Sequence, residues 1–153
     1  IHRAPLPSHL REFALRELTL LPGGDRLAHG DYHPGNVLFA RDQHAVIDWT
    51  AASRGAPEAD HARTMLLLRW ADPLPGTPLL ARSLMAAGRS IFARSYAHFY
   101  RRGRSAPLLN LSSWLTVVVA ARMSEGIDVE HPRLLAFLQA RQARVMPPKG
   151  GSA

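Results

Sequence analysis

Two short apolar runs, residues 37–40 and 45–49, stand out in a chain whose other apolar residues mostly recur at helical spacing. Each run has the length of a strand, and the four polar residues between them, 41–44, suit a hairpin connection. The sequence therefore predicts a mainly α fold with a small β-hairpin.

The helical pattern begins near the start of the chain. Leu10, Phe13, Ala14 and Leu18 recur at helical spacing, and Ser8 is a candidate for the cap of this leading helix. Polar, Gly- and Pro-punctuated residues 26–36 predict a loop, in which residues 29–32 could begin extended. Further helices are predicted at residues 58–70, 79–102, 108–125 and 133–145, and we expect one domain over residues 1–146 with a flexible tail at 147–153.

Composition excludes several classes of protein. The 153 residues include no cysteine, so neither disulfides nor thiolate metal sites are possible. The apolar stretch 114–121 is far short of a membrane span, and no signal pattern opens the chain, so we expect a soluble, cytoplasmic protein. The net charge of +7 comes mainly from dispersed arginines, with one dense cluster at Arg101, Arg102 and Arg104. Because most of these are expected to be solvated, we do not expect nucleic acid as the partner.

The residues that carry chemistry lie in and beside the predicted loop. The first block is HGDYHPGN, residues 29–36, and the second is Ile47-Asp48-Trp49. Asn36 follows Asp31 by five positions, and Asp48 follows Asn36 by twelve. An aspartate and an asparagine on one tight loop, followed by a hairpin that delivers a second aspartate, match the phosphoryl-transfer arrangement of protein kinases.

The stretches HGDYHPGNVLF and VIDWTAASRGAPEAD resemble the catalytic loop and the metal-binding hairpin of the aminoglycoside phosphotransferase and choline kinase family. The resemblance covers about residues 28 to 63. It implies the C-terminal lobe of a protein-kinase-like (α+β) fold and an enzyme that moves the γ-phosphoryl group of ATP, with Mg²⁺, to a hydroxyl of a small molecule. Aminoglycosides, choline, sugars and homoserine-like alcohols are all acceptors within the family.

The resemblance also assigns roles residue by residue. Asp31 is similar to the catalytic aspartate, which orients the acceptor hydroxyl and takes its proton. Asn36 and Asp48 match the ligands of Mg²⁺, through which the phosphates of ATP are held. His29 and Asp60 match positions that support the loop, and Pro34-Gly35 shapes its turn.

The chain departs from the family pattern before the loop. Only about 30 residues precede Asp31, they contain no Gly-rich phosphate loop, and the one lysine is Lys149. The expectation is therefore a truncated chain whose nucleotide-holding N-terminal lobe is missing and which binds ATP poorly alone.

Two other functions stay open. His29, Asp31 and His33 form an H-x-D-x-H pattern that a Zn²⁺ or Fe²⁺ metallohydrolase could use. A non-catalytic module, pseudokinase-like or binding nucleic acid through the arginine cluster, is the other. The sequence does not choose the acceptor, decide whether antibiotic resistance is involved, separate ATP from GTP or give the oligomeric state.

Overall fold

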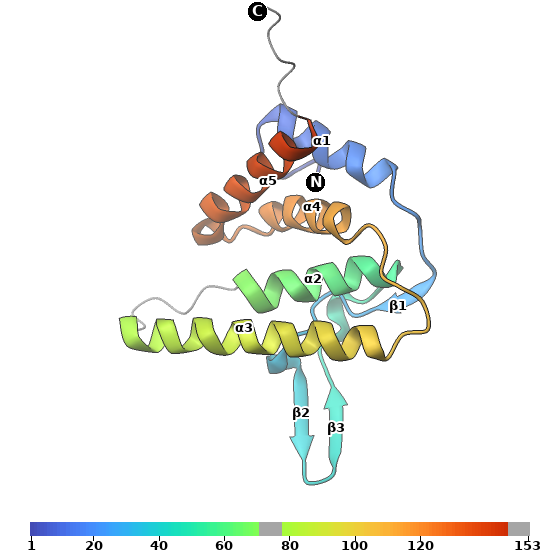
Figure 1. Cartoon of the computed structure of the whole chain (residues 1–153), viewed down its shortest axis with the longest axis vertical. Coiled ribbons are helices and arrows are strands. Elements are labelled where there is room, and N and C mark those ends of the chain that lie inside the picture. Colours follow the sequence, from blue (N-terminus) through green and yellow to red (C-terminus); the bar gives the residue numbers. More distant parts are fainter. Residues whose placement is uncertain (71–77, 147–153) are drawn as a thin grey trace, which may run out of the picture. The chain divides into compact units, whose positions relative to one another are not determined.

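The computed structural model describes residues 1–70 and 78–146 (Figure 1). The chain divides into two compact units, one made of Ile1–Leu21 and Ser112–Ala153 and the other of Pro22–Leu111. The described residues are mainly helical, with two small antiparallel sheets. No helix among them is both long and apolar enough to cross a membrane.

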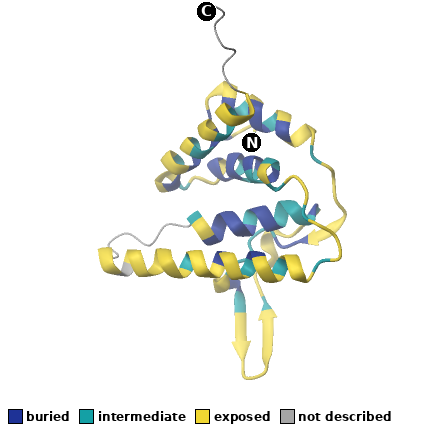
Figure 2. Ribbon diagram, in the orientation of Figure 1, coloured by how far each residue is buried: buried dark blue, intermediate teal, exposed yellow. Residues whose placement is uncertain are grey.

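The first unit is helical. It contains α1 (Ser8–Thr19), most of α4 (Leu111–Arg122) and α5 (His131–Val145), with short 3-10 turns at Met123–Glu125 and Asp128–Glu130. α1 and α5 pack against each other. Apolar side chains of these helices are buried (Figure 2), among them Leu10, Phe13, Val119, Leu134 and Leu138. Their removal from water is the main stabilising contribution in this unit.

The second unit combines two helices with both sheets. β1 (Arg26–Ala28) pairs with β4 (Ser53–Gly55), and β2 (Val37–Ala40) pairs with β3 (Gln43–Val46), both antiparallel. α2 (Pro57–Trp70) packs along α3 (Leu79–Arg102) through a cluster formed by Met65, Leu68, Ala93 and Ala97, with Tyr96 against it. The loop between β1 and β2 and the turn between β3 and β4 carry the two sequence blocks.

The predicted mainly α fold with a hairpin is confirmed, but several boundaries are wrong. β3 ends at Val46, and Trp49 lies in a 3-10 turn (Trp49–Ala51) rather than in a strand. The hairpin turn is only Arg41-Asp42, because Arg41 adopts a left-handed φ of 49° that reverses the chain sooner than expected. Residues 29–32 form no strand; the strand comes before them, at β1.

The helices were predicted more accurately. α3 has the predicted bounds, and α2 begins one residue earlier than expected. α4 is three residues shorter than predicted at each end, and α5 begins two residues earlier than predicted and ends where expected. Ser8 does not cap α1: Pro7 occupies the N-cap position and no side chain bonds there, so Ser8 is the first helical residue. The predicted tail 147–153 lies outside the described residues.

Candidate active site

Helix α2 holds the start of the loop that carries the first block. The Asp60 carboxylate accepts hydrogen bonds from the backbone N–H of His29 (3.1 Å) and of Gly30 (2.8 Å). Arg63, one turn later, donates from Nε to the carbonyl oxygen of Gly30 (3.2 Å). Both sides of residue 30 are therefore fixed by one face of α2.

Gly30 is required by this geometry. Its backbone φ is +79°, a conformation that residues other than glycine rarely adopt. A Cβ there would lie 2.5 Å from the carbonyl oxygen of Ala51. The loop can therefore pass this close to the turn after β3 only because residue 30 lacks a side chain.

His29 connects the loop to the end of the hairpin. Its Nδ1 accepts a hydrogen bond from the backbone N–H of Asp31 (3.2 Å), so the proton of the neutral ring is on Nε2, which donates to the carbonyl oxygen of Ile47 (3.0 Å). The buried ring also packs against Trp49, with ring centres 4.5 Å apart. Because both nitrogens are engaged, His29 is a poor metal ligand, which weighs against the H-x-D-x-H metallohydrolase.

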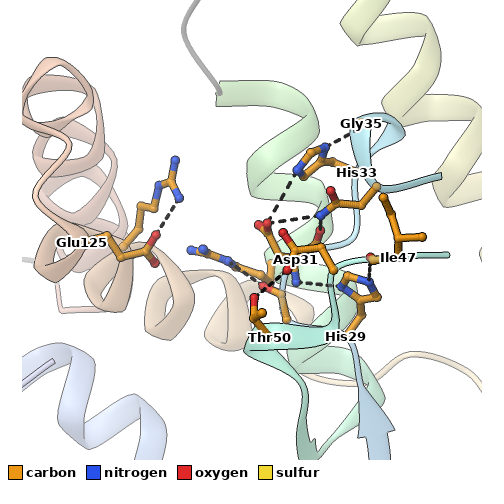
Figure 3. Close-up of polar contacts among 12 residues, drawn as sticks. His29, Asp31, His33, Gly35, Ile47, Thr50 and Glu125 are labelled. Atoms are coloured by element: carbon orange, nitrogen blue, oxygen red, sulfur yellow. Dashed lines mark hydrogen bonds and ion pairs between the residues drawn. The ribbon is translucent and has the colours of Figure 1, made fainter. Parts of the chain in front are cut away.

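Asp31 lies at the centre of a set of polar contacts (Figure 3). The Asn36 amide nitrogen donates to its carbonyl oxygen (2.9 Å) and to its carboxylate oxygen Oδ2 (3.3 Å). His33 Nε2 lies 3.6 Å from the same Oδ2, and His33 Nδ1 accepts from the N–H of Gly35 (3.1 Å). The Asp31 side chain remains one third exposed, so its carboxylate is oriented but accessible.

The hairpin brings Asp48 to the same region. The Asn36 carbonyl oxygen accepts from the N–H of Ile47 (2.9 Å), directly beyond the Val37–Val46 pair of the β2–β3 ladder. Asp48 follows with a left-handed backbone (φ 59°, ψ 63°), and its Oδ1 accepts from the hydroxyl of Thr50 (2.6 Å). This hydrogen bond holds the pKa of Asp48 below its usual value, so the exposed carboxylate is ionised at neutral pH.

The donor atoms of Asn36 and Asp48 fit Mg²⁺. The contacts of Asn36 use its amide nitrogen, which leaves the amide oxygen as the group for a cation, and Asp48 adds an anionic oxygen. Such hard oxygen donors suit Mg²⁺, which usually takes one or two protein ligands together with phosphate oxygens and waters. The described residues contain no group of three or more His, Asp or Glu side chains that could hold a metal ion.

Sequence reasoning missed three residues near this loop. Arg63 is one; the others are His61 on α2 and Tyr96 on α3, which stack on each other with ring centres 5.2 Å apart. His61 is buried, its Nδ1 has no hydrogen-bond partner, and burial lowers its pKa to about 4. The i, i+3 spacing of Asp60 and Arg63 was the one signal in the sequence that could have indicated a paired role.

Comparison with known proteins gave one match. Residues 3–100 match the sequence model described as the Phosphotransferase enzyme family. The match extends well beyond residues 28–63, on which the resemblance rested. No curated protein and no solved structure matches the chain. Since the family match spans more than half of the sequence and includes the loop, the hairpin and most of α3, this chain belongs to the phosphotransferase enzyme family.

Proposed function

We propose that this protein is a small-molecule kinase that transfers the γ-phosphoryl group of ATP, with Mg²⁺, to an alcohol, and that residues 1–146 act as a kinase-like catalytic lobe. The observation that carries the proposal is the pairing of Asp31 with Asn36, next to the hairpin end that bears Asp48. Membership of the family supports phosphoryl transfer as the reaction type. The three side chains are of the kinds that such a transfer needs, namely a carboxylate for the acceptor hydroxyl and two oxygen ligands for Mg²⁺.

Asp31 is the group that handles the acceptor. Its carboxylate accepts a hydrogen bond from the acceptor hydroxyl and takes the proton as the bond from that oxygen to the γ-phosphorus forms. The bond from the γ-phosphorus to the oxygen bridging to the β-phosphate breaks, and ADP leaves with that electron pair. Asn36 holds the carboxylate in place throughout, so positioning supplies a large share of the acceleration.

Asn36 and Asp48 are the residues that would hold the metal. Bound Mg²⁺ neutralises charge on the phosphates and orients them. The Thr50 hydroxyl keeps Asp48 ionised and oriented for this role. The acceptor remains one of the alcohol classes of the wider family, and a screen has to identify it.

The nucleic-acid alternative gains little support from the arginine cluster. Arg101 donates to the carbonyl oxygen of Ala97, and Arg104 pairs with Glu58 at 3.1 Å and lies over the ring of Tyr100. Two of the three cations are thus already used within the unit.

The test is transfer of label from γ-labelled ATP to a panel of amino sugars, amino alcohols and sugars by the natural full-length protein. We expect Mg²⁺-dependent transfer to one class, loss of turnover in Asp31→Asn, and loss of Mg²⁺-dependent ATP binding by calorimetry in Asp48→Ala. Asp42→Ala, which removes an exposed carboxylate in the hairpin turn, is the matched control. Full turnover in Asp31→Asn, or no transfer to any alcohol, would contradict the proposal.

A further inference from the structure

Tyr32 directly follows Asp31 and ties it to a second helix. Its ring meets the edge of His29, with centres 5.9 Å apart and planes at 76°, and it also lies 5.9 Å from the ring of Tyr96 on α3. The other side-chain anchors of the loop described above come from α2, from the loop itself or from Trp49 after β3. Tyr96 is therefore a separate point of support for the catalytic loop.

Tyr96 is itself held by further rings. His61 on α2 stacks against both Tyr96 and Tyr100, at centre distances of 5.2 and 4.6 Å and with planes within 30° of parallel. Tyr96 and Tyr100 also contact each other at 5.4 Å. Together Tyr32, Tyr96, His61 and Tyr100 form what we call the aromatic column, which runs from the loop across both helices.

Two observations indicate that the aromatic column is rigid. Tyr96 packs against the buried α2–α3 cluster that contains Ala93 and Ala97, and a close-packed interior restricts the movement of a ring in contact with it. Burial also keeps His61 neutral at physiological pH, so its ring stacks without a charge that would draw water into the column. Aromatic contacts of this kind add stability beyond that of their buried area.

We propose that Tyr96 is a positioning residue for phosphoryl transfer: through its contact with Tyr32 it fixes the backbone next to Asp31 and so the direction of the catalytic carboxylate. The inference rests on the proposed function of Asp31. One planar, rigid peptide unit links the Cα atoms of Asp31 and Tyr32, so a displacement of the Tyr32 backbone is passed on to Asp31. Release of Tyr32 from Tyr96 therefore lets the carboxylate leave its position while Asp60 and Arg63 still hold residues 29 and 30.

The position of Tyr96 makes a specific kinetic prediction. The hydrogen bonds of Asn36 and Asp48 within the described residues do not involve the rings of the aromatic column, so we expect binding of MgATP to depend little on it. Loss of the ring should lower kcat by about tenfold or more, because a small misplacement of a catalytic group is costly. The KM for ATP should change by less than about twofold.

The experiment compares Tyr96→Leu with Tyr96→Phe in the full-length protein. Tyr96→Phe keeps the ring and should restore kcat, whereas Tyr96→Leu should not. Phe99→Leu, which removes an exposed ring from the same helix, is the control and should leave kcat unchanged. Equal kcat for Tyr96→Leu and the natural protein, or equal losses in kcat from Tyr96→Phe and Tyr96→Leu, would overturn the inference.

A second measurement does not depend on turnover. Amide hydrogen exchange of the peptide spanning residues 29–36 should be faster in Tyr96→Leu than in Tyr96→Phe, with the α5 amides unchanged as an internal reference for folding. Unchanged exchange in the loop would refute the positioning role even if Tyr96→Leu unfolds too readily for kinetics. If Asp31→Asn abolishes transfer but Tyr96→Leu does not affect it, the proposed function stands and this inference fails. If no alcohol is phosphorylated, the proposed function fails, while the exchange result still tests the contact.

Discussion

Each of the two units contains a cluster of charged side chains, and the clusters differ in what they leave accessible. In the first unit Arg122 donates from two nitrogens to both oxygens of the buried Glu130, at 2.8 and 2.9 Å, and from a third to Glu125. In the second unit the Asp31 carboxylate accepts a hydrogen bond from the Asn36 amide and lies 3.6 Å from His33, yet the side chain stays one third exposed. The first cluster buries its charges and pairs them with one another, whereas the second leaves a carboxylate accessible to solvent. The two clusters thus differ in what remains exposed.

The largest loss of stability should come from removing Arg122 from the cluster that it forms with Glu125 and Glu130. Arg122→Met removes every hydrogen bond that Glu130 receives from that side chain and leaves a buried carboxylate, so the free energy of unfolding should fall by about 3–5 kcal/mol. The pKa of Arg122 is raised by these carboxylates, which means that its charge contributes at every pH at which they are ionised. Urea denaturation measures the change, with the exposed Arg144→Met as control. A loss below about 1 kcal/mol would show that this pair behaves like a surface ion pair.

The second-largest effect should come from removing the Asp60 carboxylate, which holds the start of the loop. Asp60→Ala leaves the N–H groups of His29 and Gly30 without their acceptor, which costs about 2 kcal/mol of unfolding free energy and frees the loop. Turnover should fall far more than stability does, since Asp31 lies next to the released residues. Asp60→Asn keeps one acceptor oxygen, so its unfolding free energy and its turnover should lie between those of the natural protein and those of Asp60→Ala. Equal turnover in all three would mean that α2 does not position the loop.

A loss of stability of similar size is expected from a substitution at Gly30. Gly30→Ala places a methyl group against Ala51 at a left-handed φ, which should cost about 1–3 kcal/mol and lower kcat. Thermal unfolding together with kcat tests this. Gly88→Ala, at a helical position with open space around it, is the control and should be neutral or stabilising.

The effect that is smallest at neutral pH concerns the titration of His61, because it develops only as the pH falls. His61 has a pKa of about 4 in the folded chain against an ordinary value of 6.5, so the unfolded chain takes up the proton first. Stability from this group is complete above pH 6.5 and decreases as the pH falls toward 4, by about 3 kcal/mol in total. His61→Phe keeps a ring in the stack and removes the titration, so its unfolding free energy should depend less on pH in that window. Parallel pH curves for the two proteins would show that His61 does not titrate as its burial implies.

Much of this molecule could be predicted from its sequence, and the parts that could not share a physical reason. Helices α2 and α3 follow from apolar periodicity and proline positions, and the spacing of Asp31, Asn36 and Asp48 indicated a phosphotransferase before any geometry was known. β1 and β4 were missed because three residues are too few for a periodic signal, and 24 residues separate the strands. Arg63 contacts Gly30 across 33 positions, and Tyr96 meets Tyr32 only because α3 folds back along α2. Such contacts depend on tertiary packing rather than on any local pattern.

The left-handed backbone at Asp48 has an evolutionary consequence. A site with this φ is most easily occupied by glycine, yet only a residue with a side-chain oxygen could serve a cation there. Selection for folding and selection for catalysis therefore favour different amino acids at one codon. A library at position 48 sorted for stability alone should enrich glycine, and the same library sorted for phosphoryl transfer should return aspartate.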